Sequence, residues 1–108
     1  MQDNSFTDYI VYDILGHIPD IRTKKMFSGV GIYVGDSIVA FVAGGELYFK
    51  SDAALVQKYT ALECHPFTYT KNGKDIALKY MSATESMLED RAIMEERIAE
   101  ALSLNNKE

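Results

Sequence analysis

Three two-residue turn signals constrain the fold of this chain more than any other feature of its sequence. They are Gly35-Asp36, Gly44-Gly45 and Asn72-Gly73. Each dipeptide tolerates the positive φ angles of tight hairpin turns and separates two runs rich in β-branched and aromatic residues. The sequence therefore predicts a three-stranded antiparallel meander followed later by a separate hairpin. The predicted strands span 30–34, 37–43, 46–50, 66–71 and 74–81.

Capping residues and apolar stripes predict three helices in the remaining segments. The first begins at Ser5 and ends near Gly16, and the second is capped by Asp52. The third begins within 82–85 and extends to about Leu104. The predicted order is helix, three strands, helix, two strands, helix. At 108 residues this indicates one α+β domain over 1–108, with a sheet covered by helices.

Strand alternation predicts a meander that is apolar on both faces. Two-residue loops pair Tyr33 with Ile38, Ile32 with Val39 and Phe41 with Tyr48. One face then carries Tyr33, Ile38, Ala40, Val42, Leu47 and Phe49, and the other carries Val30, Ile32, Val34, Val39, Phe41 and Tyr48. Either the helices cover both faces or a second copy of the chain covers one of them as a homodimer.

The second hairpin has a single apolar face. It consists of Phe67, Tyr69, Ile76, Leu78 and Tyr80. Polar residues occupy the alternate positions, which is typical of a strand pair with one buried face.

Charge and composition exclude several classes of protein. The formal net charge of −5 argues against broad nonspecific binding to nucleic acids or anionic membranes. Apolar stretches such as 38–43 are too short to cross a bilayer, and the first residues do not resemble a signal peptide. The single cysteine, Cys64, cannot form an intrachain disulfide and fits a reducing compartment. We expect a cytoplasmic protein without a membrane segment.

No cluster of residues indicates catalysis, a cofactor or a metal. Cys64-His65 is the one thiol–imidazole neighbour pair, but adjacent side chains in an extended segment point apart. One cysteine and two histidines do not form a zinc ligand set. We therefore expect no catalytic residue, no cofactor and no metal site.

Two weaker functional hypotheses remain open. Arg22, Lys24 and Lys25 form the one compact basic cluster, which we interpret first as a solvated approach to the first strand. Direct DNA binding through this cluster is an alternative, although the acidic balance and the lack of a recognition helix argue against it. A small ligand-binding domain would instead use Cys64 or a pocket formed by tyrosines, for which the candidates are Tyr9, Tyr33 and Tyr48.

Several short motifs resemble the N-terminal domain of the TfoX/Sxy family. They are the run 25–33 (KMFSGVGIY), Phe41, the run 47–50 (LYFK), Pro66-Phe67-x-Tyr69, Tyr80 and Leu88-Glu89. The resemblance spans roughly positions 6 to 102. The chain departs from the family pattern at Ser28, where glycine is usual, and at Thr84, where proline is usual. A tryptophan often found in the last helix is missing.

This resemblance implies a fold and a function. The family domain is similar to the two-layer secretion-chaperone-like fold. Its members look like regulators of natural competence and DNA transformation that act with a cyclic-AMP receptor-type transcription factor. We therefore expect a non-enzymatic regulatory module that works by protein–protein contact, either with such a factor or with a second copy. The candidate interaction surface consists of Lys25, Met26, Phe27, Val39, Phe41 and Tyr48.

Overall fold

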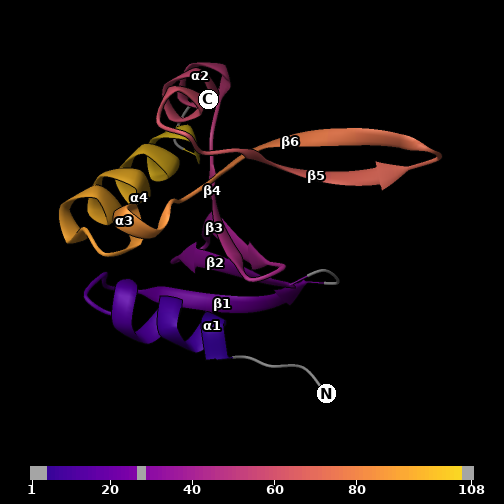
Figure 1. Cartoon of the computed structure of the whole chain (residues 1–108). Helices are drawn as coiled ribbons and strands as arrows, with labels where there is room; N and C mark the ends of the chain where they lie inside the picture. Colours follow the sequence, from indigo (N-terminus) through magenta and orange to yellow (C-terminus); the bar gives the residue numbers. More distant parts are fainter. Residues whose placement is uncertain (1–4, 27–28, 106–108) are drawn as a thin grey trace.

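The computed structural model describes residues 5–26 and 29–105 as one antiparallel sheet with helices (Figure 1). The sheet has six strands in the order β1-β2-β3-β4-β6-β5. The strands are β1 (Ile21–Met26), β2 (Gly29–Val34), β3 (Ser37–Ala43), β4 (Glu46–Lys50), β5 (Pro66–Lys71) and β6 (Lys74–Ser82). The helices are α1 (Ser5–Asp8), η1 (Tyr9–Ile14), α2 (Ala53–Ala61), α3 (Glu85–Leu88) and α4 (Arg91–Asn105). The α+β class and the antiparallel sheet are confirmed.

The predicted hairpin turns form as expected. Gly35, Gly44, Gly45 and Gly73 all have positive φ angles, and so does Asn72. The turns set the register near each loop, where Tyr33 pairs with Ile38, Phe41 with Tyr48, and Tyr69 with Ile76. The expectation of a single sheet is confirmed, because β4 pairs with β6 and joins the predicted meander to the second hairpin.

One strand was missed by the sequence reasoning. The segment interpreted as a solvated approach is β1, which pairs with β2 from Ile21 opposite Val34 to Met26 opposite Gly29. An edge strand tolerates several exposed charges, and such charges discourage pairing with another chain. The charged residues of β1 therefore masked its strand character.

The first and last helical segments differ from the predicted single helices. The N-terminal segment is α1 followed by the π-helical η1, which ends at Ile14 with Leu15 as its C-cap. The C-terminal segment breaks into α3 and α4 at Glu89–Asp90, where the Asp90 carboxylate accepts a hydrogen bond from the Ile93 amide. The second helix is confirmed, with Asp52 accepting from the amide of Leu55.

The main core lies between the helices and one face of the sheet. It joins Ile10, Ile32, Val42, Leu47, Phe49, Met81, Met94 and Ile98, among others. Figure 1 shows α2, α3 and α4 gathered on this side of the sheet, while the β5–β6 hairpin projects away from them. We call this hairpin (66–82) the arm, and the sheet face opposite the main core the open face.

Val39 does not lie where strand alternation placed it. The pairing of β2 with β3 shifts between Ile32 and Tyr33, so that Ile32 lies opposite Ala40 instead of Val39. The extra residue in β3 is a β-bulge, and neighbouring side chains at a bulge can point to the same side. Val39 is accordingly fully buried in the main core with Ala40 and Ile32. The predicted assignment of Val39 and Ile32 to the face of Phe41 was wrong.

Candidate functional site

An aromatic cluster covers the centre of the open face. Phe41 and Tyr48 are ladder partners on β3 and β4, with ring centroids 5.3 Å apart. The arm adds Phe67 at 5.0 Å and Tyr80 at 4.9 Å from the Phe41 ring. Phe41 and Tyr48 are each only 7% exposed. Side chains of the sheet itself therefore shield this second core.

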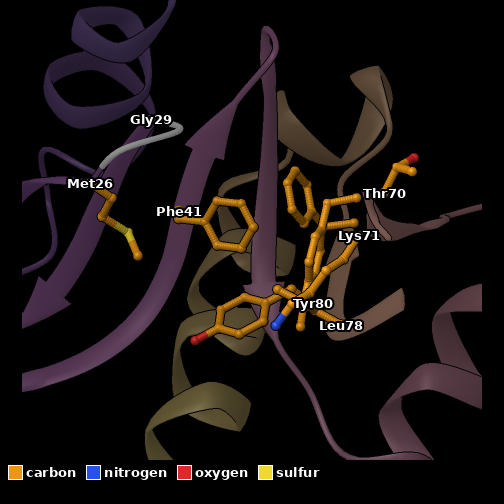
Figure 2. Close-up of a pocket in the computed structure, with 9 residues that line it drawn as sticks. Met26, Gly29, Phe41, Thr70, Lys71, Leu78 and Tyr80 are labelled. Atoms are coloured by element: carbon orange, nitrogen blue, oxygen red, sulfur yellow. The ribbon is translucent and has the colours of Figure 1, made fainter. Parts of the chain in front are cut away.

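A groove of about 620 Å³ lies beside the aromatic cluster. We call it the open-face groove. It is lined by Met26, Gly29, Phe41, Phe67, Tyr69, Thr70, Lys71, Leu78 and Tyr80. Figure 2 shows Phe41 between Met26 on one side and Leu78 and Lys71 on the other. The groove is thus formed by the first edge of the sheet, its centre and the projecting arm.

The walls of the groove expose apolar side chains that the rest of the molecule does not cover. Met26 is 38%, Tyr69 40% and Leu78 37% exposed. The apolar face of the arm was expected to be an ordinary buried face. Instead, its inner part packs on Phe41, while Tyr69 and Leu78 remain half-open to solvent.

Gly31 allows Met26 to reach over the sheet. A Cβ atom at Gly31 would lie 3.0 Å from the Met26 sulfur and 3.2 Å from a ring carbon of Tyr33. The absence of a side chain therefore leaves room for Met26 beside the neighbouring strand. A methionine in this position is flexible and polarisable, and such side chains adapt to apolar partners.

The basic cluster of the sequence is divided between two faces. Arg22 lies opposite Tyr33 and Lys24 opposite Gly31, which in turn lies opposite Phe41. Paired residues share a face, so Arg22 and Lys24 lie on the open face. Lys25 alternates to the other face, opposite Val30. The three bases are close together in the sequence, but the alternation of side chains along β1 separates Lys25 from Arg22 and Lys24.

Charge on the open face comes from two edges. Arg22 contacts Asp20 at 3.4 Å and Asp36 at 3.9 Å, both exposed. On the arm, Lys71 lines the groove and lies directly opposite Lys74. The open-face groove is consequently apolar on its floor and basic at its margins.

Tyrosine pKa values reflect the dry floor of the open face. Burial, followed by the nearby Tyr33 phenol, raises the pKa of Tyr80. Burial and the adjacent Glu46 carboxylate also raise the pKa of Tyr48. Both phenols stay neutral near pH 7, so Tyr80 offers the groove aromatic surface and no charge, and Tyr48 adds no charge to the aromatic cluster beside it.

Cys64 is buried, whereas the neighbouring His65 is exposed. The Cys64 thiol is buried, with its sulfur 3.8 Å from the Met87 sulfur. The His65 ring contacts Glu46 at 3.1 Å and Ser82 at 3.3 Å. Burial raises the pKa of the Cys64 thiol, which disfavours the thiolate that nucleophilic catalysis needs.

A smaller depression of 380 Å³ lies beside His65. It is lined by Phe6, Gly45, Glu46, Leu47, Glu63, His65, Ser82, Ala83, Thr84, Glu85 and Leu88. Among the described residues, no three His, Cys, Asp or Glu side chains come together in a way that could hold a metal ion. Of the carboxylates here, Glu46 contacts His65, and Glu63 and Glu85 are exposed.

The remaining sequence-predicted site residues are only partly brought together. Lys25 and Met26 lie side by side on β1 but face opposite ways, and Phe27 lies outside the described residues. Phe41 and Tyr48 form the aromatic cluster. The ligand hypothesis named Tyr9, Tyr33 and Tyr48. None of these tyrosines is among the residues that line the groove.

Sequence reasoning did not identify the arm as part of the site. The apolar stripe of this hairpin was visible in the sequence, and so was the lack of a predicted helix to cover it.

Within residues 5–26 and 29–105, no helix is both long and apolar enough to cross a membrane.

Comparison with known proteins identifies the family. A search of curated proteins finds no match to the chain. The sequence model of the TfoX N-terminal domain matches residues 13–104, which include all six strands of the sheet, η1 from Asp13 onward and most of α4. The chain therefore belongs to the TfoX N-terminal domain family.

Proposed function

We propose that this chain is a non-enzymatic regulatory protein that acts by binding another protein through the open-face groove. The observation that carries the proposal is the set of half-exposed apolar side chains on the groove walls, Met26, Tyr69 and Leu78. Exposed apolar patches bordered by polar residues are typical of interaction sites. Membership of the TfoX N-terminal domain family supports a regulatory role.

The resemblance to TfoX/Sxy regulators suggests the biological setting. We propose a cytoplasmic role in natural competence and DNA transformation, with a cyclic-AMP receptor-type transcription factor as the first partner to test. The site is on the face opposite the helices, so a bound protein would contact strands and the arm.

A pull-down with this transcription factor tests the proposal. Leu78→Asp places a charge on the groove wall, and we expect it to reduce capture at least tenfold. Leu62→Asp is the matched control, because Leu62 is 49% exposed at the end of α2, away from the groove. Lys25→Glu tests the basic residue that the sequence suggested.

Equal capture of wild-type protein and Leu78→Asp would contradict a contact through the groove. Loss of capture with Leu62→Asp alone would move the contact to the helical side. A loss of folding is checked by circular dichroism of each variant.

Direct DNA binding is a second candidate, supported by the basic margins of the groove. Arg22, Lys24 and Lys71 would contact phosphates, and binding would weaken steeply with salt. A gel shift with double-stranded DNA at two salt concentrations tests it. An absent or salt-insensitive shift would contradict it.

A further inference from the structure

We propose that the partner segment in the open-face groove is acidic and carries apolar anchor side chains. This inference rests on the proposed function and specifies the chemistry of its partner. It comes from the distribution of charge over the fold, together with the shape of the groove.

Charge is strongly segregated between the groove margins and the rest of the molecule. The two segments that border the groove, β1 (Ile21–Met26) and the arm (66–82), contain six bases and one acid, for a formal charge of +5. Strand alternation places Arg22, Lys24, Lys71 and Lys74 on the open face, and Lys25, Lys79 and Asp75 on the other. The whole chain has −5, so all other residues together carry −10. A partner that approaches the groove therefore meets lysines at both of its margins, on a chain that is acidic as a whole. Basic margins of this kind select and orient an acidic segment.

Several of these bases lack a counter-charge within the described part of the chain. Lys24, Lys71 and Lys74 form no ion pair with any described residue. Lys71 and Lys74 moreover lie directly opposite each other near the tip of the arm. Like charges in this position repel each other and destabilise the strand pair. A carboxylate from a partner would relieve this repulsion.

The floor between these bases accepts apolar side chains. Met26 and Leu78 face the groove with Tyr69, and the volume of 620 Å³ is large enough for two or three side chains. A helix or extended segment with aromatic or aliphatic anchors could occupy this floor while its acids contact the lysines at either margin.

A single-stranded nucleic acid fits the groove less well. Base stacking needs exposed aromatic faces, but Phe41 and Tyr48 are buried against each other and against the arm. The −10 charge of the remaining surface also opposes a long polyanion more than a short acidic segment. A groove-to-groove dimer would bring two positive surfaces together.

A displayed library of random peptides tests the inference without knowledge of the partner. The library is selected on the wild-type chain, on Lys24→Glu/Lys71→Glu, and on Leu78→Asp. Lys79→Glu is the matched control, because it changes the charge of the same arm at a residue between the groove-lining Leu78 and Tyr80. Fluorescence anisotropy of the enriched peptides and of a single-stranded oligothymidine then gives dissociation constants at low and high salt.

We expect the wild type and Lys79→Glu to enrich peptides with several Asp or Glu residues around aromatic or aliphatic anchors. The Lys24→Glu/Lys71→Glu variant should bind these peptides at least tenfold more weakly and should instead enrich Lys- or Arg-containing peptides. Leu78→Asp should bind neither the acidic peptides nor the Lys- or Arg-containing ones.

Three results would overturn the inference. Enrichment of neutral or basic peptides on the wild type would leave the proposed function standing but refute an acidic partner. Tighter binding of oligothymidine than of any peptide would identify a nucleic acid, instead of an acidic protein segment, as the ligand of the groove. A wild-type dimer in sedimentation that becomes monomeric with Leu78→Asp would identify a second copy as the occupant. Failure of the proposed function would look different, since peptides would then bind Leu78→Asp and wild type equally or bind neither.

Discussion

The guanidinium carbon of Arg97 lies 3.9 Å from the centre of the Tyr59 ring, inside the core between α2, α4 and the sheet. Its other neighbours are the Phe49 ring at 4.6 Å and two backbone carbonyls of β6. Arg97 is 1% exposed, and burial lowers its pKa from the usual value. A charged side chain therefore holds the last helix against the end of the arm.

Replacement of Arg97 by methionine should destabilise the fold by about 2–4 kcal/mol. Methionine preserves much of the packing, but the carbonyls of Met81 and Ser82 lose their donors, which now lie at 3.0 and 2.7 Å. Urea unfolding monitored by circular dichroism measures the free energy of unfolding. Arg91→Met is the control, since the exposed Arg91 makes only a 3.9 Å contact with Glu95, and it should change stability by less than about 0.5 kcal/mol. Similar losses in both variants would refute the role of the buried guanidinium.

Phe41→Ala should destabilise the protein by about 3 kcal/mol. The ring contacts three other aromatic rings, so its removal leaves a cavity at the base of the arm. Tyr69→Ala, at a 40% exposed position, should cost less than about 1 kcal/mol. Thermal and urea unfolding of both variants would measure the difference. Equal stabilities would mean that the aromatic cluster contributes no packing energy.

Gly73→Ala should destabilise the arm by about 1 kcal/mol. The φ angle of Gly73 is +77°, while an added Cβ would meet no atom within 4 Å, so the cost is one of backbone conformation. Gly31→Ala differs in kind, because it would press on the movable Met26 side chain and would perturb the groove more than the turn. Amide hydrogen exchange of β5 and β6 should increase in the first variant. Unchanged protection would contradict the prediction.

Stability should fall between about pH 10 and pH 12 because of Tyr59. Burial, and then a 2.6 Å hydrogen bond to Glu100, raise the pKa of Tyr59 to about 12 from the usual 10.0. Below pH 10 the phenol is protonated in both states, so its contribution to stability is complete. Between the two values only the unfolded chain releases the proton, and the contribution is lost as pH rises through the folded pKa.

Urea unfolding at pH 9, 10 and 11 tests this effect, together with phenolate absorbance at 295 nm. Tyr59→Phe should reduce the slope of the pH dependence in this range, and Tyr48 and Tyr80, whose pKa values are also raised, should account for part of the remaining slope. A Tyr12→Phe control, at an exposed tyrosine, should retain the wild-type slope. Identical slopes in wild type and Tyr59→Phe would assign the effect to other groups.

The Cys64 thiol should react with a disulfide reagent at least about tenfold more slowly in the folded protein than in urea. The side chain is buried beside Met87, and its burial raises the pKa of the thiol. Stopped-flow or spectrophotometric labelling at pH 8 measures both rates. Rapid labelling of the folded protein would contradict this prediction and make Cys64 a candidate nucleophile again.

Local sequence signals predicted the parts of the fold that depend on neighbouring residues. The Gly35, Gly44 and Asn72-Gly73 turns set their own φ angles, and the turns set the register of the adjacent pairs. Asp52 caps α2 through a hydrogen bond from the amide of Leu55, which is likewise a contact between near neighbours in the sequence. Of the residues that the sequence suggested for an interaction surface, Met26 and Phe41 line the groove and Tyr48 lies beside it, whereas the arm was not among the predicted residues.

The sequence by itself determined the three hairpins, the α+β class and the family, because each depends on short-range conformational preference or on matching motifs. Tertiary structure decided the rest. Pairing of β4 with β6 fixed the place of the second hairpin within the single sheet, the bulge at Val39 put this residue and Ile32 in the main core, and β1 became the edge that bears Lys24. Such outcomes depend on contacts between residues far apart in the chain, and strand alternation alone does not specify them.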